Sequence, residues 1–427
     1  MAMKRTLSLA AMAAAAMLAA SAASAASLKI LDHGSRGAAE LDAIAAQVAA
    51  WNRSHPDIPA ELVTLPKPIE NQTVQAKALA GTWPDILDFD GPSFANAAWA
   101  GLLAPLDDLL PPDLMRALLP SIRAQGLYAP DGKIYALGQF DSGLGLWASR
   151  SALRQAGIRI PSGLDDAWTG EEFEAALAAL KRAGYPTPLD MKLNYGVGEW
   201  YTYGFAPILQ SYGGDLINRT TWQAEGTINS EASIAALGRI QSWMKAGYIV
   251  PASEGDDAFY GKRSAALALV GHWMWPTHSA ALGSDLVLLP MPRFGARHVT
   301  GMGSWNWGIW SGSPNKEAAA KFLEFLMSEP AMEAVAGAAG AIPSRQAAAE
   351  RNPLFRQGGP MALYREQLTR IAVPRPPHPA YPVISRAFAA AVNSVMKGED
   401  PKRALDRAAA AIDQEIEQTN GYKPFGG

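Results

Sequence analysis

The sequence predicts an α/β protein with two lobes, and three observations lead to this fold class. Short strand-like runs alternate with segments whose apolar residues recur at helical spacing, a pattern that favours largely parallel sheets. The chain has 427 residues, which is long enough for two hydrophobic cores. No internal repeat or low-complexity linker divides it, so we expect two lobes joined by several crossings of the chain.

The first part of the chain has the pattern that opens a doubly wound lobe. Strand-like runs are expected at 28–32, 61–65 and 85–89. The stretches between them, 40–53 and 67–80, are predicted helices; in the first, apolar residues recur three or four positions apart. The order strand, helix, strand, helix, strand follows from these segments.

Later segments continue the alternation of strands and helices. Strands are predicted at 144–148, 266–270 and 286–289. A capping box at Thr169–Glu172 predicts a helix start. Ser313-Pro314 and Asp400-Pro401 each combine an N-cap residue with proline at the first helical position.

The N-terminus has the three parts of a secretory signal peptide, and we assign residues 1–26 to it. Lys4 and Arg5 precede a nearly wholly apolar stretch at 7–20, and small residues follow up to Ser27. The apolar stretch is short and rich in alanine, whereas a membrane span needs about 20 strongly apolar residues. We therefore expect cleavage near Ala26 and secretion of the remaining chain.

The absence of cysteine limits what the secreted chain can be. The sequence contains no Cys, which excludes disulfides, thiolate metal sites and cysteine nucleophiles. A lipid-anchored protein of this kind needs a cysteine at the cleavage point, so we expect a soluble periplasmic protein without a lipid anchor. We expect neither a metal nor a cofactor.

Charge and motifs argue against nucleic acid, membrane and catalysis. The formal charge is −3, and removing two of the 37 basic residues with the signal peptide leaves 35 against 40 acidic residues, about −5. The basic residues are scattered, which is atypical of nucleic-acid or anionic-membrane binding. No nucleophile elbow, zinc-protease motif or phosphate loop occurs. We expect a protein that is not an enzyme and does not insert stably into membranes.

Several short motifs resemble those of the extracellular solute-binding proteins of ABC importers, the family that includes maltose-binding protein. They occur in the family's order over nearly the whole chain after residue 26. The motifs are Gly81-Thr82-Trp83-Pro84-Asp85-Ile86, Gly101-Leu102-Leu103-Ala104-Pro105-Leu106, Gly132-Lys133-Ile134-Tyr135-Ala136-Leu137, Trp168-Thr169-Gly170-Glu171-Glu172-Phe173, Gly271-His272-Trp273, Ser313-Pro314-Asn315-Lys316-Glu317-Ala318-Ala319 and Ile342-Pro343-Ser344-Arg345. Gly138 stands where the family usually has proline.

The resemblance implies a periplasmic-binding-protein-like fold, with two doubly wound α/β lobes, a multi-segment hinge and a ligand cleft between the lobes. It places 27–139 and about 290–340 in the N-terminal lobe, and 140–289 and about 341–427 in the C-terminal lobe. It also implies a monomer that delivers a small molecule to the membrane permease subunits of an ABC importer. The ligand itself does not follow from family membership.

The candidate ligand contacts come from positions after strands, because open α/β sheets bind ligands beyond the carboxyl ends of their strands. Glu199, Trp200 and Tyr201 are included as aromatic and acidic residues expected in a glycine-rich loop. The predicted ligand-binding residues are His33, Arg36, Phe89, Asp90, Ser93, Asp141, Glu199, Trp200, Tyr201, Trp273, Trp275, Ser304, Trp305 and Arg345.

The aromatic residues in this set favour a carbohydrate. One face of a pyranose packs on an aromatic ring, while its hydroxyl edge needs polar partners such as carboxylates. Trp273 and Trp305 are the preferred stacking residues. The sequence contains 13 tryptophans, and we expect at least half of them in the cores.

Several alternatives remain open at this stage. Asp90 and Ser93 also suit a helix N-cap, Asp141 suits a hinge contact, and Arg345 suits a salt bridge between lobes. Arg36 and Arg345 leave an acidic or sulfonated sugar open. The remaining alternatives are a receptor for a polyamine, a chelate or a peptide, and a periplasmic glycan-acting enzyme.

Overall fold

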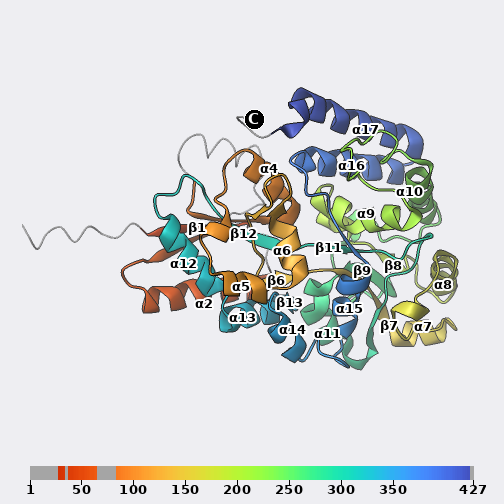
Figure 1. Cartoon of the computed structure of the whole chain (residues 1–427). Helices are drawn as coiled ribbons and strands as arrows, with labels where there is room; N and C mark the ends of the chain where they lie inside the picture. Colours follow the sequence, from red (N-terminus) through yellow and green to blue (C-terminus); the bar gives the residue numbers. More distant parts are fainter. Residues whose placement is uncertain (1–26, 34–36, 65–82, 424–427) are drawn as a thin grey trace, which may run out of the picture.

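The computed structural model describes residues 27–33, 37–64 and 83–423. It contains two four-stranded sheets, each covered by helices, with short ladders between them (Figure 1). The predicted α/β fold class is confirmed. The predicted signal peptide, the predicted helix at 67–80 and Arg36 lie outside the described residues. Within the described part of the chain, no helix has the length and apolar character needed to cross a membrane.

The first sheet has the order β12-β3-β1-β2. Its strands are β1 (Leu28–Asp32), β2 (Ala60–Thr64), β3 (Ile86–Asp90) and β12 (Trp305–Ile309). β1 is parallel to both β2 and β3, as predicted for a doubly wound lobe, and β12 is antiparallel to β3. The helices α2 (Ala38–Ser54), α12 (Lys316–Leu326) and α13 (Glu329–Ala339) share one core with this sheet. We call this part of the molecule the first lobe.

The second sheet has the order β10-β7-β9-β8. Its strands are β7 (Leu144–Ser149), β8 (Leu189–Asp190), β9 (Leu267–Gly271) and β10 (Leu286–Leu289). β7 is antiparallel to both neighbours, and only β8 and β9 are parallel. The expectation of largely parallel sheets was therefore wrong for this sheet. β7 follows directly after the segment that connects the two lobes, and it is antiparallel to both β9 and β10. We call this part the second lobe.

Helices pack around the second sheet and along the remaining chain. The main core of the second lobe joins this sheet to α8 (Gly170–Arg182), α9 (Glu199–Tyr212), α10 (Glu231–Lys245), α16 (Tyr381–Met396) and α17 (Pro401–Gln418). The other α-helices are α4 (Phe94–Trp99), α5 (Pro112–Ala117), α6 (Pro120–Gly126), α7 (Arg150–Gln155), α11 (Trp275–Leu282), α14 (Gln346–Arg351) and α15 (Ala362–Arg370). A small hairpin pairs β4 (Leu127–Tyr128) with β5 (Lys133–Ile134).

Two short ladders lie between the sheets, where Figure 1 shows the chain passing from one lobe to the other. β6 (Phe140–Asp141) pairs antiparallel with β13 (Ile342–Pro343). β11 (Thr300–Met302) pairs in parallel with β14 (Ala372–Pro374). The chain therefore crosses between lobes in several segments rather than through one linker.

The local predictions had mixed outcomes. The Thr169–Glu172 capping box is present in both directions, and the Asp400 side chain caps α17. Ser313-Pro314 does not begin a helix, since α12 starts at Lys316; the Ser313 hydroxyl donates to Asp85 at 2.5 Å and accepts from the Asn315 amide at 2.9 Å. Residues 199–203 were expected in a loop, but they form the first turns of α9.

Candidate functional site

The strand ends of both sheets face the crossings, and His272 shows how the two lobes meet there. His272 directly follows β9. Its Nδ1 donates to the Ala339 carbonyl of the first lobe at 3.1 Å, and its Nε2 accepts from the Ser142 hydroxyl of the crossing at 2.8 Å. Burial lowers the pKa of His272 to about 4, in spite of backbone contacts at Ala339 and Gly340 that raise it. The ring is therefore neutral at pH 7 and fits this pair of bonds.

The first lobe presents an imidazole stacked on an indole. His33 follows β1, and its ring lies on Trp305 with centroids 3.3 Å apart and planes 3° apart. Nδ1 of His33 donates to Asp88 at 2.5 Å, and both side chains are buried. Next to Trp305, the amide of Ser304 donates to Gln125. The stack thus places the C-terminal end of β1 and the N-terminal end of β12 next to each other at one edge of the sheet.

An ion triad connects the first lobe to the second. Arg375, which follows β14, makes a bidentate pair with Asp90 at the end of β3, with distances of 2.6 and 2.7 Å. The same guanidinium bonds Glu199 at the start of α9, at 2.5 Å. It also lies over the Tyr203 ring, 4.7 Å from the centroid. Asp90 and Glu199, predicted separately, are thus brought together by an arginine that was not predicted.

Glu199 is held by further bonds inside the second lobe. Tyr381 and Ser385, both on α16, donate their hydroxyl protons to its carboxylate. Burial is the main cause that raises the pKa of Glu199; Arg375 opposes this and Asp90 adds to it. The negative charge of Glu199 therefore depends on the donors that surround it.

Four aromatic rings of the second lobe cluster beside this triad. Trp200 and Tyr203 lie on α9, Trp273 follows β9, and Tyr195 follows β8. Trp273 packs edge-on against Trp200 at 6.0 Å and lies tilted by 32° against Tyr203 at 6.2 Å. Its indole N–H donates to the Tyr195 hydroxyl at 3.3 Å. Tyr195 is exposed and Trp273 and Trp200 are half-buried, so the cluster leaves part of its ring surface uncovered by protein.

Two glycines allow the indoles to lie this close to the backbone. A Cβ placed on Gly271 would lie 2.0 Å from the Trp273 ring, so any side chain there would displace the indole. A Cβ on Gly204 would lie 3.2 Å from the Trp200 ring. The positions of both indoles therefore depend on missing side chains, most strictly at Gly271.

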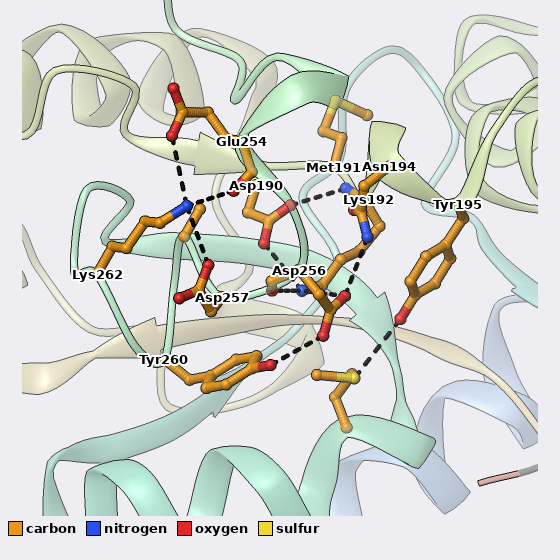
Figure 2. Close-up of polar contacts among 12 residues, drawn as sticks. Asp190, Met191, Lys192, Asn194, Tyr195, Glu254, Asp256, Asp257, Tyr260 and Lys262 are labelled. Carbon is orange, nitrogen blue, oxygen red and sulfur yellow. Dashed lines mark hydrogen bonds and ion pairs between the residues drawn. The ribbon is translucent and has the colours of Figure 1, made fainter.

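A buried charge network supports the loop that carries Tyr195 (Figure 2). The Lys192 ammonium is fully buried and contacts Asp190 at 3.0 Å and Asp256 at 3.1 Å. Lys192 has a positive φ of 53°, which turns the chain after β8. The carbonyl of Met191 then accepts a bond from the Trp200 indole at 3.1 Å. The network thus fixes the loop beneath the aromatic cluster.

The structure brings only part of the predicted set together at this site. His33, Asp90, Glu199, Trp200, Trp273, Ser304 and Trp305 lie in the groups described above. Tyr201 is instead buried in the second-lobe core against Phe205. Trp275 begins α11 and lies 6.0 Å from Trp147, within the packing of a neighbouring core cluster.

Four further predicted residues lie outside these groups and have their main contacts elsewhere in the protein. Asp141 is fully buried and accepts from Gln125 and from the Ser142 amide. The Arg345 guanidinium donates to the Met327 carbonyl at 3.2 Å. Phe89 packs beside a first-lobe core cluster. Ser93 is half-buried in the turn before α4 and its side chain makes no cap.

The residues missed by sequence reasoning are Arg375, Tyr203, Tyr195, Tyr381 and Ser385. Arg375 lies within the proline-rich stretch 374–382, which indicated an extended connection and gave no sign of a buried cation. Tyr203 lies one helical turn after Glu199, a spacing that would have placed both on one face had α9 been recognised.

One cluster has the composition of a metal site. Asp32, His33 and Asp88 place one oxygen or nitrogen each within 4.8 Å of one another, and all three are buried. His33 already donates to Asp88 and stacks on Trp305. These contacts explain the position of the His33 ring without a metal ion, and we assign no metal to this cluster.

Two surface hollows lie apart from this site. One, of about 500 Å³, is lined by residues near Trp99 and Tyr128 of the first lobe. The other, of about 350 Å³, lies between α16 and α17 near Arg386 and Glu415. Neither contains a predicted site residue. In this structure the strand-end side chains contact each other across the lobes.

Comparison with known proteins identifies the family. The model of the family described as "Bacterial extracellular solute-binding protein" matches residues 35–333. The match covers well over half of the chain, and the chain belongs to this family. It is a solute-binding protein of a non-enzymatic class, which confirms the expectation that it is not an enzyme.

Similar proteins extend the likeness over nearly the whole chain. A galactooligosaccharide-binding protein of Bacillus subtilis is 22% identical over 90% of this chain and 88% of its own. The GacH receptor of Streptomyces glaucescens, solved unliganded and with acarbose, has a TM-score of 0.77 and 22% identity, covering 93% of this chain and 99% of that one. UgpB of Mycobacterium tuberculosis, solved with glycerophosphocholine, has a TM-score of 0.74 and 18% identity, covering 92% and 99%.

Proposed function

We propose that this protein is the periplasmic receptor of an ABC importer for a carbohydrate, either a mono- or oligosaccharide, a polyol or a modified sugar. The observation that carries the proposal is the aromatic cluster of the second lobe lying beside the carboxylates of the interlobe triad. Aromatic faces suit the C–H face of a sugar, and carboxylates accept its hydroxyl protons. The sugar-binding relatives support the same ligand class.

The proposed mechanism is closure of two lobes around the ligand. We propose that the first lobe comprises 27–139 and a returning stretch up to about 340, and that the second lobe comprises the rest. Met291 and Phe294 pack in the second-lobe core, so we propose that the returning stretch begins at the β11 crossing, after residue 302, and not at 290. Binding shifts the open–closed equilibrium only by the extra contacts that the ligand makes in the closed form.

The closed form would then dock, as a monomer, on the permease subunits. We further propose that a signal peptide at 1–26 directs the chain to the periplasm without a lipid anchor. Both proposals rest on the sequence motifs and on the family, whose members are extracellular.

A ligand screen tests the proposal. Melting temperature and tryptophan fluorescence are measured with di- and trisaccharides of glucose, galactose and mannose, with polyols, and with glycerophosphocholine as the non-sugar probe. A sugar that binds raises the melting temperature by mass action and changes the indole emission. Stabilisation by glycerophosphocholine and by none of the sugars or polyols would replace the carbohydrate proposal with a non-sugar receptor.

A further inference from the structure

The guanidinium of Arg375 is already committed to carboxylates of the protein itself. Two of its nitrogens bond Asp90 and one of these also bonds Glu199, while the side chain is only 6% exposed. Its face is covered by the Tyr203 ring. Nη2 would lie 2.7 Å from a Cβ on Gly303, which shows how closely the backbone packs against it. Arg375 therefore has little freedom to turn towards a ligand.

The charges of the triad do not balance. Asp90 and Glu199 carry two acidic groups, and among the residues that the structure describes Arg375 is the one Lys or Arg paired with either of them. Within the triad, a ligand therefore meets two acidic side chains and one cation that is already paired with both.

From these contacts we propose that the site selects uncharged or amine-bearing sugars and rejects acidic ones. The inference rests on the proposed carbohydrate function and narrows its ligand class. An acidic sugar would have to displace Asp90 or Glu199 from Arg375. Since these carboxylates come from opposite lobes, that displacement would also break the link between the lobes. A hydroxyl group, in contrast, donates to the carboxylates while Arg375 keeps its pairs.

The electrostatics of Glu199 support this reading of the geometry. Burial first, and then the neighbouring Asp90, raise the pKa of Glu199 above its usual range. The enclosed region thus already disfavours a second negative charge. A carboxylate or sulfonate on the ligand would be subject to the same desolvation and the same repulsion.

Native mass spectrometry of the mature protein, with competing oligosaccharide libraries, tests the inference. The libraries are neutral (starch and galactan hydrolysates), acidic (pectate and alginate hydrolysates) and basic (chitosan hydrolysate), mixed at equal concentration. The wild type should retain neutral or basic sugars at least about tenfold more than acidic ones, the scale expected for one unpaired charge in a partly enclosed site. Preferential retention of an acidic sugar would overturn the inference and leave the carbohydrate function standing.

Charge variants make the test independent of overall affinity. Asp90→Asn frees one pair of Arg375 donors, so the acidic-to-neutral binding ratio should rise about tenfold or more, whatever happens to neutral binding. Asp113→Asn, an exposed carboxylate on α5, changes the net charge equally and should leave the ratio unchanged. An unchanged ratio in Asp90→Asn, or an equal rise in Asp113→Asn, would contradict the inference. Retention of no library, together with no stabilisation by any sugar or polyol of the ligand screen, would instead remove the proposed function and the inference with it.

Discussion

Two charge networks in this molecule, each built around a buried cation, differ in where their members come from. The Lys192 network joins Asp190, Lys192 and Asp256, all of which belong to the second lobe (Figure 2). The Arg375 triad joins Asp90 of the first lobe to Glu199 of the second. The first network keeps its contacts whether the lobes are apart or together, whereas the second exists only when they meet.

This difference assigns separate roles to networks of similar chemistry. Lys192 is 0% exposed and Asp190 1% exposed as side chains, so neither can be hydrated without unfolding the loop. Asp90 and Glu199 are 18% and 34% exposed, and separation of the lobes would hydrate both. We therefore propose that the Lys192 network contributes to stability, and that the Arg375 triad contributes to the interlobe equilibrium and to ligand choice.

The largest expected effect is that of Lys192→Met on stability. The change leaves Asp190 buried without its cation, which costs about 3–5 kcal/mol of unfolding free energy. Denaturant unfolding followed by circular dichroism measures it. Lys402→Met, at an exposed lysine paired with Asp406, should cost less than about 0.5 kcal/mol. Equal costs in the two variants would show that the Lys192 network does not stabilise the second lobe.

The next effect concerns His272, which follows β9 of the second lobe and bonds Ala339 of the first. Its pKa falls from 6.5 unfolded to about 4 folded, so its contribution is complete above about pH 6.5 and is lost as the pH falls towards 4. From pH 6.5 to 5 this amounts to about 2 kcal/mol. The unfolding free energy is measured at pH 6.5 and at pH 5 for the wild type and for His272→Gln. Its decrease between the two pH values should be smaller in the variant by about 2 kcal/mol. An unchanged pH dependence would exclude a buried neutral His272.

Ligand affinity should respond to the aromatic cluster that the Lys192 network supports. Trp273→Ala removes a ring placed for stacking and should weaken binding of the sugar found in the screen by about 1–3 kcal/mol, without unfolding the protein. Isothermal titration calorimetry measures the change. Trp310→Ala is the matched control, since this half-buried indole follows the opposite end of β12 from Trp305. Equal affinity in wild type and Trp273→Ala would remove Trp273 from the site.

Among the residues of the two networks, Arg375→Met should have the smaller effect on stability. Asp90 can become hydrated as the lobes separate, and Glu199 retains Tyr381 and Ser385, so the cost should stay below about 1 kcal/mol. Small-angle scattering of the ligand-free variant should show a larger radius of gyration than the wild type. A stability cost as large as that of Lys192→Met, with no change in dimensions, would erase the distinction between the networks.

The sequence predicted the parts of this site that depend on local order. His33, Asp90 and Trp305 directly follow or border strands of the first sheet, and the rule that ligands bind at strand ends selected them as candidates. It could not find Arg375, because 285 positions separate it from Asp90. Long-range contacts, such as the pairing of β11 with β14 and the bond from Asn96 to the Pro379 carbonyl, bring the two together.

The error at Glu199–Tyr203 has a different cause. Flanking glycines suggested a loop, but Gly198 precedes the helix and Gly204 lies within it, where it makes room for the Trp200 ring. The antiparallel entry of β7 was equally hidden, since a buried strand has the same apolar pattern in either direction. Long-range pairing, and not local composition, decided these features.

A crystal structure of the protein grown with the tightest-binding sugar from the screen tests the central claim most directly. The account predicts the sugar between the lobes, with one ring face against Trp273 and hydroxyl groups bonded to Asp90 or Glu199. A sugar bound outside the space between the lobes, such as in the hollow between α16 and α17, with the Asp90–Arg375–Glu199 triad and Trp273 untouched, would contradict it.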